Sequence, residues 1–233
     1  DALTVIYYDK ANVDPKNPKK QDRDRVIMSK GHAGPAMYAV LCDLGYFPKE
    51  WMKTLNQNGT NLPSHCDMNK TPGIDMTAGS LGQGLSAAVG MALAAKIDRN
   101  PATIYCFIGD GESQEGQIWE ASMFAGSRKL DNLIVLLDSN RMQLDGPVES
   151  INGLEPIVDK WKAFNFFVQD VDGHDLSAIS DAIDAAKAQH EKPSMIVLRT
   201  VKGKGASFTE GVANCHSMSV PEEVWRKETG RYE

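Results

Sequence analysis

The sequence predicts an α/β fold in which a parallel sheet carries helices on both faces. Short apolar runs such as TIYCFI, NLIVLLD and SMIVLRTV alternate with segments long enough to form helices. Strands that alternate with helices in this way imply right-handed crossovers and a parallel sheet. We therefore expect ligands to bind at the carboxyl ends of the strands.

The elements can be assigned in chain order. Residues 1–10 resemble the end of an amphipathic helix, and prolines exclude a regular element from the polar stretch 13–25. Residues 26–45 give a short apolar run, a Gly-His turn and a helix. The remaining segments are predicted as a loop at 61–76, a glycine-rich turn at 78–84, a helix at 85–99, a strand at 103–108, a turn at 109–112, a helix at 115–130, a strand at 132–138, a turn at 139–146, a strand at 165–172, a helix at 175–189 capped by Asp175, and a strand at 194–201.

Composition sets the class of protein. A chain of 233 residues with 42% hydrophobic residues can bury a full core, and we expect one domain with a tail after about residue 205. The net charge of −6 and the scattered basic residues argue against nucleic acid as a partner. No apolar stretch is long enough to span a membrane, and no signal peptide is evident. The cysteines lack CxxC spacing, so we expect reduced thiols and a cytoplasmic location.

Oxygen-bearing side chains follow two of the predicted strands. The first strand leads to Asp110 in the turn GDGESQEG, and the second leads to Ser139 and Asn140. If the strands are neighbours, Asp110 and Asn140 form a half-shell for Mg²⁺ or Ca²⁺, which phosphate, water and a backbone carbonyl would complete. Such an ion explains why carboxylates accompany a glycine spacing typical of phosphate-binding loops. Taken alone, Asp110 is equally explained as a turn former and Asn140 is better explained as one, but their pairing favours the metal site.

The sequence around these residues resembles a known family. GDG followed about thirty residues later by Asn is the diphosphate-anchoring motif of thiamine-diphosphate enzymes. The longer string GDGESQEGQIWEASMFAGSRKLDNLIVLLDSNRMQLDG resembles transketolase, as do DRDRVIMSKGHA and AGSLGQGLS. The resemblance extends over the chain but matches only the diphosphate-binding domain of the family. It therefore implies a thiamine-diphosphate-binding fold and the N-terminal subunit of a split transketolase.

The resemblance implies which residues hold the cofactor and its ion. The divalent ion would be bound by Asp110, Asn140 and the backbone carbonyl of Met142. Glycine-rich turns would present backbone N–H groups to thiamine diphosphate. The implied cofactor-binding residues are His32, Gly79, Ser80, Leu81, Gly109, Asp110, Gly111, Asn140, Lys202 and His216. For Lys202, a solvated lysine at the end of a strand is the alternative interpretation.

Three histidines match residues that line the substrate channel of the family. His32 in SKGHA is the clearest match, whereas Cys66 follows His65 where the family usually has proline, and His216 lies in a divergent tail. Imidazoles that titrate near neutrality suit the proton transfers of aldehyde and ketose chemistry, so these are candidate catalytic residues. Without the motifs, each is better explained as a surface or packing residue.

Two glutamates resemble a pair at the subunit interface of the family. Glu115 would approach the catalytic glutamate of the partner and is a candidate catalytic residue, and Glu120 follows it on the same helix. A favourable charge in the first helical turn explains Glu115 equally well and is compatible with that role. The resemblance assigns no role to Glu112.

The implied function is that of an enzyme subunit. It would transfer a two-carbon ketol unit from a ketose to an aldose, using thiamine diphosphate and Mg²⁺. The family's pyrimidine-binding domain supplies a glutamate that this sequence lacks, so we expect a second chain in a heterotetramer with two copies of each. A Gly-His segment that the family carries upstream is expected to be removed or disordered. The alternatives are a Mg²⁺-dependent phosphohydrolase, a non-catalytic scaffold subunit or a 2-oxoacid dehydrogenase α-like subunit.

Overall fold

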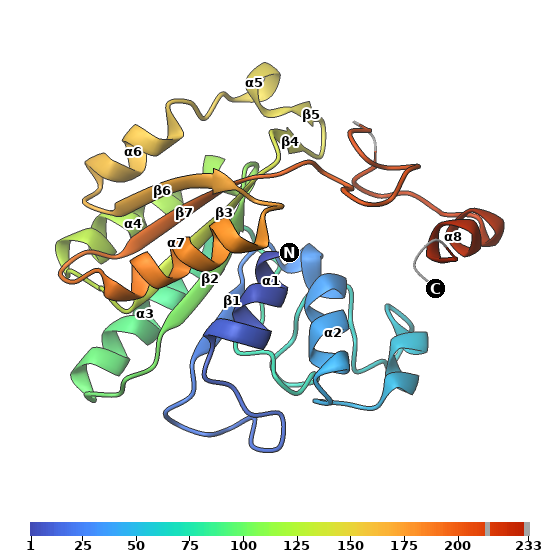
Figure 1. The fold of residues 1–233 in the computed structure, drawn as a ribbon, viewed down its shortest axis with the longest axis horizontal. Helices are drawn as coiled ribbons and strands as arrows, with labels where there is room; N and C mark the ends of the chain where they lie inside the picture. The colour runs from blue at the N-terminus through green and yellow to red at the C-terminus, as the bar shows by residue number, and fades with distance from the viewer. Residues whose placement is uncertain (213–214, 231–233) are drawn as a thin grey trace.

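A central parallel sheet organises the chain (Figure 1). The computed structural model describes residues 1–212 and 215–230. In spatial order, the five strands that these residues place in the sheet are β1 (Arg25–Met28), β2 (Ile104–Gly109), β3 (Leu133–Ser139), β7 (Ser194–Arg199) and β6 (Phe167–Asp172). All neighbouring strands run parallel, so the predicted fold class is confirmed. A short antiparallel pair, β4 (Met142–Gln143) and β5 (Gly146–Pro147), lies in the turn after β3.

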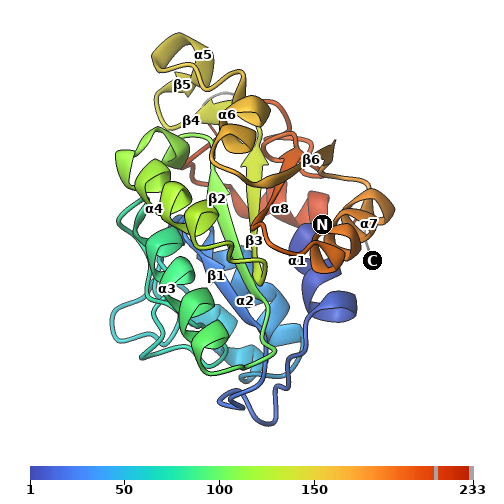
Figure 2. The same cartoon turned by 90° about the vertical axis from the view of Figure 1, so that its left-hand side faces the viewer.

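Helices cover both faces of this sheet, and Figure 2 shows α3 and α4 on the side opposite α1 and α7. One face carries α1 (Ala2–Val5), α2 (Gly34–Asp43) and α7 (Leu176–Ala188), and the other carries α3 (Gln83–Ile97), α4 (Gly116–Ser127) and α6 (Ile157–Ala163). The connecting segments contain η1 (Ile6–Lys10), η2 (Gly31–Ala33), η3 (Lys49–Thr54), η4 (Glu112–Gln114) and α5 (Val148–Ile151). Across the described ranges, no helix has both the length and the apolar character needed to cross a bilayer.

The strands are apolar throughout because both of their faces are buried. In β2, Ile104, Cys106 and Ile108 contribute to the core beneath α3 and α4, whereas Tyr105 and Phe107 contribute to the core beneath α2 and α7. Every residue of β2 is buried. Continuous apolar runs are typical of parallel strands that are covered on both faces, so these strands can be recognised in the sequence.

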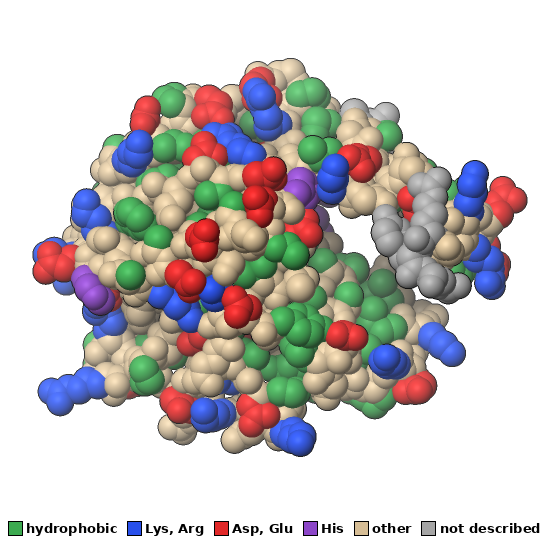
Figure 3. All heavy atoms as spheres, in the orientation of Figure 1, with side chains coloured by type: hydrophobic (Ala, Val, Ile, Leu, Met, Phe, Trp, Pro, Cys, Tyr) green, Lys and Arg blue, Asp and Glu red, His purple; other side chains and the backbone are tan. Residues whose placement is uncertain are grey.

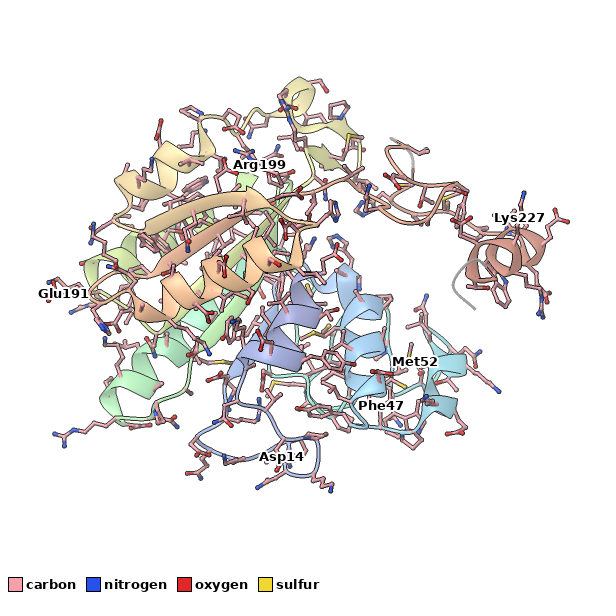
Figure 4. All side chains as sticks on the ribbon, viewed as in Figure 1. Asp14, Phe47, Met52, Glu191, Arg199 and Lys227 are labelled. Carbon is pink, nitrogen blue, oxygen red and sulfur yellow. The ribbon has the colours of Figure 1, made fainter. Side chains whose placement is uncertain are left out.

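The sequence predicted neither α6 nor the short elements η3 and α5, and two further elements were also not expected from it. β1 forms from the apolar run after the polar loop and pairs with β2. The second is α8 (Glu222–Thr229), in the tail that extends away from the body after β7, with Lys227 labelled far from the sheet in Figure 4. Arg226 Nε donates a hydrogen bond of 2.8 Å to Glu222, and the acidic first turn and basic last turn suit the helix dipole.

Helix α4 approaches the end of α6 very closely at Gly126. A Cβ atom built on Gly126 would lie 1.9 Å from the backbone oxygen of Phe164. The absence of a side chain therefore allows these two helices to pack on the same face of the sheet. The contact matters for function because α4 connects β2 to β3.

We expect Gly126→Ala to lower the free energy of unfolding by roughly 1–3 kcal/mol, because the added methyl group must displace backbone atoms. Gly90→Ala is the matched control, since a Cβ on that exposed glycine of α3 meets no atom within 4 Å. The control should be more stable than wild type by about 0.5–1 kcal/mol. Urea unfolding followed by circular dichroism measures both changes, and a Gly126→Ala protein as stable as wild type would contradict the close contact.

Candidate functional site

The turns after β2 and β3 lie side by side at the carboxyl edge of the sheet. The two strands pair in parallel, with Gly109 opposite Asp138, which confirms that they are neighbours. The Asp110 carboxylate accepts a hydrogen bond from the backbone N–H of Arg141 in the second turn. In that same turn, the side-chain oxygen of Asn140 accepts a 3.0 Å hydrogen bond from the N–H of Met142. Asp110 and Asn140 thus belong to directly contacting turns.

A cavity of about 650 Å³ opens at this edge. Figure 3 shows the molecule hollowed between the main body and the segment that follows β7. Figure 4 labels Arg199, the last residue of β7, at this edge, and Glu191 at the opposite edge. Most of the predicted site residues line the cavity: His32, Leu81, Gly109, Asp110, Gly111, Glu115, Asn140, Met142, Lys202 and His216. His65, Gly79, Ser80 and Glu120 are not among the described residues that line it.

Asp110 is a buried carboxylate in the cavity wall. Asp110 is only 5% exposed. Burial raises the pKa of Asp110 to about 6, the hydrogen bond from Arg141 opposes that rise, and the negative charge of Asp138 adds to it. A divalent cation would supply further positive charge. Asp110 and Asn140 offer hard oxygen donors, and Met142, whose backbone carbonyl is the third candidate ligand, lines the same cavity. Donors of this kind fit Mg²⁺ or Ca²⁺ completed by water and phosphate oxygens.

The cavity also fits a diphosphate. Lys30 and Lys202 both line the cavity, so two basic side chains border the space beside the proposed ion. A Cβ atom on Gly111 would lie 3.1 Å from that of Gln143, and a glycine there leaves the backbone accessible to a ligand. The residues present therefore fit an ion that carries a diphosphate group.

Lys30 and Asp138 were not identified from the sequence. The two side chains form an ion pair in the cavity wall, and the side chain of Thr200 also donates a hydrogen bond to Asp138. Burial alone would raise the pKa of Asp138, but the charge and hydrogen bond of Lys30 outweigh it and lower the pKa. The signal in the sequence was their position, since Lys30 precedes the Gly-His turn and Asp138 lies near the end of a predicted strand.

Two of the predicted histidines contact each other in the cavity. The rings of His32 and His216 have centroids 5.1 Å apart, and Lys202 Nζ lies 3.0 Å from His216 Nδ1. Because an ammonium group can only donate, Nδ1 of His216 is the acceptor and its proton resides on Nε2. Partial burial, the repulsion that a protonated His216 would exert, and the positive charge of Lys30 lower the pKa of His32 to about 4. His32 is therefore a neutral imidazole at pH 7.

The third histidine lies outside this cluster. His65 is exposed and packs on the glycine-rich turn, where a Cβ atom on Gly79 would lie 3.4 Å from its ring. Its Nδ1 lies 3.3 Å from Ser64 Oγ. The field of His65 still contributes to lowering the pKa of His32, so His65 is near the cavity without lining it. Its catalytic role, and the cofactor contacts of Gly79 and Ser80, stay predictions.

The two candidate interface glutamates are both exposed. Glu115 occupies the N-cap position of α4 without a side-chain capping hydrogen bond and lines the cavity, and Glu120 lies further along the same helix. Both positions are accessible to another protein chain. Their role at an interface stays a prediction.

Glu112, to which the sequence assigned no role, is buried beside Asp110. The residue is 2% exposed and its carboxylate accepts hydrogen bonds from three segments of the chain. Burial raises the pKa of Glu112, and the hydrogen bond from Ser29 is the largest opposing effect. Long-range contacts of this kind leave no local pattern in a sequence.

Comparison with known proteins identifies the family. Residues 1–230 match the family described as "Transketolase, thiamine diphosphate binding domain". The chain is 58% identical over 226 residues to the 6-deoxy-6-sulfo-D-fructose transketolase subunit SqwG of Clostridium sp. (strain MSTE9), with 97% of this chain and 82% of that protein covered. The chain belongs to the transketolase family.

Other transketolases agree with this assignment. An apulose-4-phosphate transketolase subunit of Phocaeicola vulgatus is 40% identical over 216 residues, which cover 93% of this chain and 76% of that protein. The crystal structure of transketolase from Campylobacter jejuni superposes with a TM-score of 0.93 at 36% identity and covers 99% of this chain. The chain spans 37% of that transketolase. It is thus a transketolase-type subunit with the family's thiamine diphosphate binding domain, and the alternatives are not favoured.

The raised pKa of Asp110 predicts a pH-dependent cost to the stability of this transketolase subunit without metal. A folded-state pKa of about 6, above the ordinary value of 3.8, means that the folded chain holds this proton more tightly than the unfolded chain does. The carboxylate therefore destabilises the fold above about pH 6, and this cost disappears below about pH 4. Asp110→Asn should raise the free energy of unfolding at pH 8 by an amount on the order of 1–3 kcal/mol.

The gain should be constant from pH 8 down to about pH 6 and should shrink between about pH 6 and pH 4, where the folded and unfolded chains bind this proton differently. Chemical unfolding in chelator-treated buffer measures it. Asp145→Asn changes an exposed carboxylate in the turn after β3 and should show no pH-dependent gain. An Asp110→Asn protein less stable than wild type at pH 8 would rule out this account of the buried charge.

Proposed function

We propose that this chain is the cofactor-binding subunit of a two-chain transketolase, which transfers a two-carbon ketol unit from a ketose to an aldose with thiamine diphosphate and Mg²⁺. The observation that carries the proposal is the pair of contacting turns bearing Asp110 and Asn140 at one cavity wall. Membership of the transketolase family supports the reaction type. Ca²⁺ has the same preference for oxygen ligands and is the other candidate ion.

The residues of this chain would bind and orient the cofactor. Asp110, Asn140 and the Met142 carbonyl would hold the ion, and Lys30 and Lys202 would neutralise the diphosphate. Backbone N–H groups of the glycine turns, with Leu81 and Gly111 at the cavity wall, would donate further hydrogen bonds. Thiamine diphosphate, when bound, supplies the chemistry that breaks and forms the carbon–carbon bond beside a carbonyl group.

The histidines would handle protons of the sugar hydroxyl groups. His32 is neutral at pH 7 and can accept a proton, since burial and neighbouring positive charges lower its pKa to about 4. His216 is held in one tautomer by the 3.0 Å contact between its Nδ1 and Lys202, which leaves its Nε2–H as a donor. An acceptor and a donor whose rings are 5.1 Å apart can contact neighbouring hydroxyl groups of one substrate.

A second chain would complete the site. The relatives that are 58% and 40% identical are both named as transketolase subunits, and this supports a two-chain organisation. We propose that the partner carries the pyrimidine-binding domain and its catalytic glutamate, which would reach the cavity past exposed Glu115. Helix α4 also exposes Met123 and Phe124, which are 59% and 40% accessible. Together with Glu120, they favour α4 as an interface in a heterotetramer with two copies of each chain.

The substrate and the compartment are proposed from two further observations. The relative that is 58% identical is named for 6-deoxy-6-sulfo-D-fructose, which supports a sulfonated ketose as the donor substrate for this chain as well. The four cysteines are free thiols, and three of them are buried. Unpaired cysteines suit a reducing compartment, so we propose that the enzyme works in the cytoplasm.

The metal assignment can be tested by binding. Asp110→Ala should weaken Mg²⁺-dependent binding of thiamine diphosphate at least about ten-fold, because it removes the charged ligand of the ion. Asn140→Ala should also weaken the Mg²⁺-dependent binding of thiamine diphosphate. Asp131→Ala, which removes a carboxylate before the opposite end of β3, should bind as wild type does. Isothermal titration calorimetry measures all four proteins, and equal affinity in Asp110→Ala and wild type would refute the assignment.

The two-chain proposal predicts that the purified chain alone has no ketol transferase activity. Adding a polypeptide with the pyrimidine-binding domain should restore turnover, because that domain supplies the missing glutamate. A coupled assay with 6-deoxy-6-sulfo-D-fructose or fructose 6-phosphate as donor measures this, and we expect a higher kcat/KM for the sulfonated ketose. Full turnover by the chain alone would contradict the two-chain organisation. A higher kcat/KM for fructose 6-phosphate would contradict the proposed donor.

A further inference from the structure

Glu112 joins three segments that build the cavity. Its Oε1 atom accepts hydrogen bonds from the hydroxyl group of Ser29 and from the backbone N–H of Gly82, the latter at 2.9 Å. Its Oε2 atom accepts a 3.2 Å hydrogen bond from the backbone N–H of Gly109. These donors lie after β1, in the glycine-rich turn before α3, and at the end of β2.

Each donor is next to, or is itself, a residue of the cavity wall. Ser29 precedes Lys30, Gly82 follows Leu81, and Gly109 is part of the wall. Moving any one of the three donors would therefore move a group that faces the proposed diphosphate. Glu112 itself also lines the cavity, at the point where the three segments meet.

The three segments are also pressed together sterically. Gly84, in the turn of α3 that follows Gly82, has no room for a side chain, since a Cβ atom there would lie 2.5 Å from Ser29 Oγ. Gly82 itself has a φ of +88°, a left-handed conformation that favours glycine. A turn with this backbone freedom needs an external contact to hold it in one arrangement, and the Glu112 carboxylate supplies one.

We propose that Glu112 is a positioning residue that holds the three diphosphate-facing segments in register. The inference rests on the proposed function, because it concerns how this chain prepares the diphosphate site. Its chemistry requires a carboxylate, which accepts hydrogen bonds on both oxygens and donates none when ionised. An amide of the same shape could keep its oxygen towards Ser29 and Gly82, but its NH₂ group would then face the N–H of Gly109. The turn that carries Asp110 would be pushed out of place.

Glu112→Gln is the test, with inorganic diphosphate and thiamine diphosphate as two probes, each titrated in the presence of Mg²⁺. We expect both affinities to fall by about ten-fold and by the same factor, because the displaced segments face the part that the two probes share. The measurement is made by calorimetry on the full chain, at a temperature well below the unfolding of every variant. Near-ultraviolet circular dichroism verifies that each variant is folded.

Asp24→Asn is the matched control. Asp24 is also buried, being 4% exposed, and it accepts backbone hydrogen bonds of 2.9 Å from Asn12 and 2.7 Å from Thr103. It lies before β1, at the opposite edge of the sheet from the cavity. The control should lose stability as Glu112→Gln does, yet bind both probes with wild-type affinity. A general loss of stability would weaken binding in both variants alike, and that result would overturn the positioning role.

The remaining outcomes are also decisive. Wild-type affinity in a folded Glu112→Gln protein would overturn this inference and leave the proposed function intact, whereas a wild-type chain that binds neither probe would contradict the proposed function itself. If Glu112→Gln does not fold, Ser29→Ala decides the question. This substitution removes one of the three hydrogen bonds to Glu112 and, unlike Glu112→Gln, does not place two N–H donors against each other. We therefore expect the affinity for both probes to be about three-fold weaker. Unchanged affinity in that variant would overturn the inference.

Discussion

The parallel pairing of β2 with β3 is the constraint on which the site depends. Since both strands run in the same direction, the turns that carry Asp110 and Asn140 leave the sheet at one edge and contact each other. The register is set by the two cores, because a one-residue slip would exchange the positions of Tyr105 and Cys106 between unlike faces. The same slip would separate the two turns. Packing of the apolar strands therefore determines the geometry of the polar site.

Asp138, Glu112 and Asp110, the three carboxylates at this edge, are stabilised in different ways. Asp138 pairs with Lys30, which lowers its pKa. Glu112 is satisfied by uncharged donors from three segments. Asp110 accepts a backbone N–H yet keeps a pKa raised to about 6 by burial. The pKa of Asp110 stays raised although the charges of Lys30 and Arg199 oppose the rise, so a divalent ion bound there would supply further positive charge.

Much of the fold could be predicted from the sequence because strands buried on both faces leave continuous apolar runs. β2, β3 and β7 were predicted from such runs, and α7 from its periodicity and its cap, Asp175, whose carboxylate accepts the N–H groups of Ser177 and Ala178. β1 was left as an apolar run because four residues of edge strand, Arg25–Met28, carry little pattern of their own. α8 was missed because its mainly polar residues bury little apolar surface.

The sequence by itself determined the chemistry at the strand ends. Asp110 and Asn140 each follow an apolar run closely, which can be seen from neighbouring residues alone, and the motif around them resembles transketolase. The tertiary structure alone decided which groups meet there. Ser29 and Glu112 are 83 residues apart in the chain, and Lys30 and Asp138 are 108 apart, yet each pair is in contact. A contact at such separations, and the pKa that burial imposes on it, depends on how whole elements pack, and no local pattern of residues encodes that.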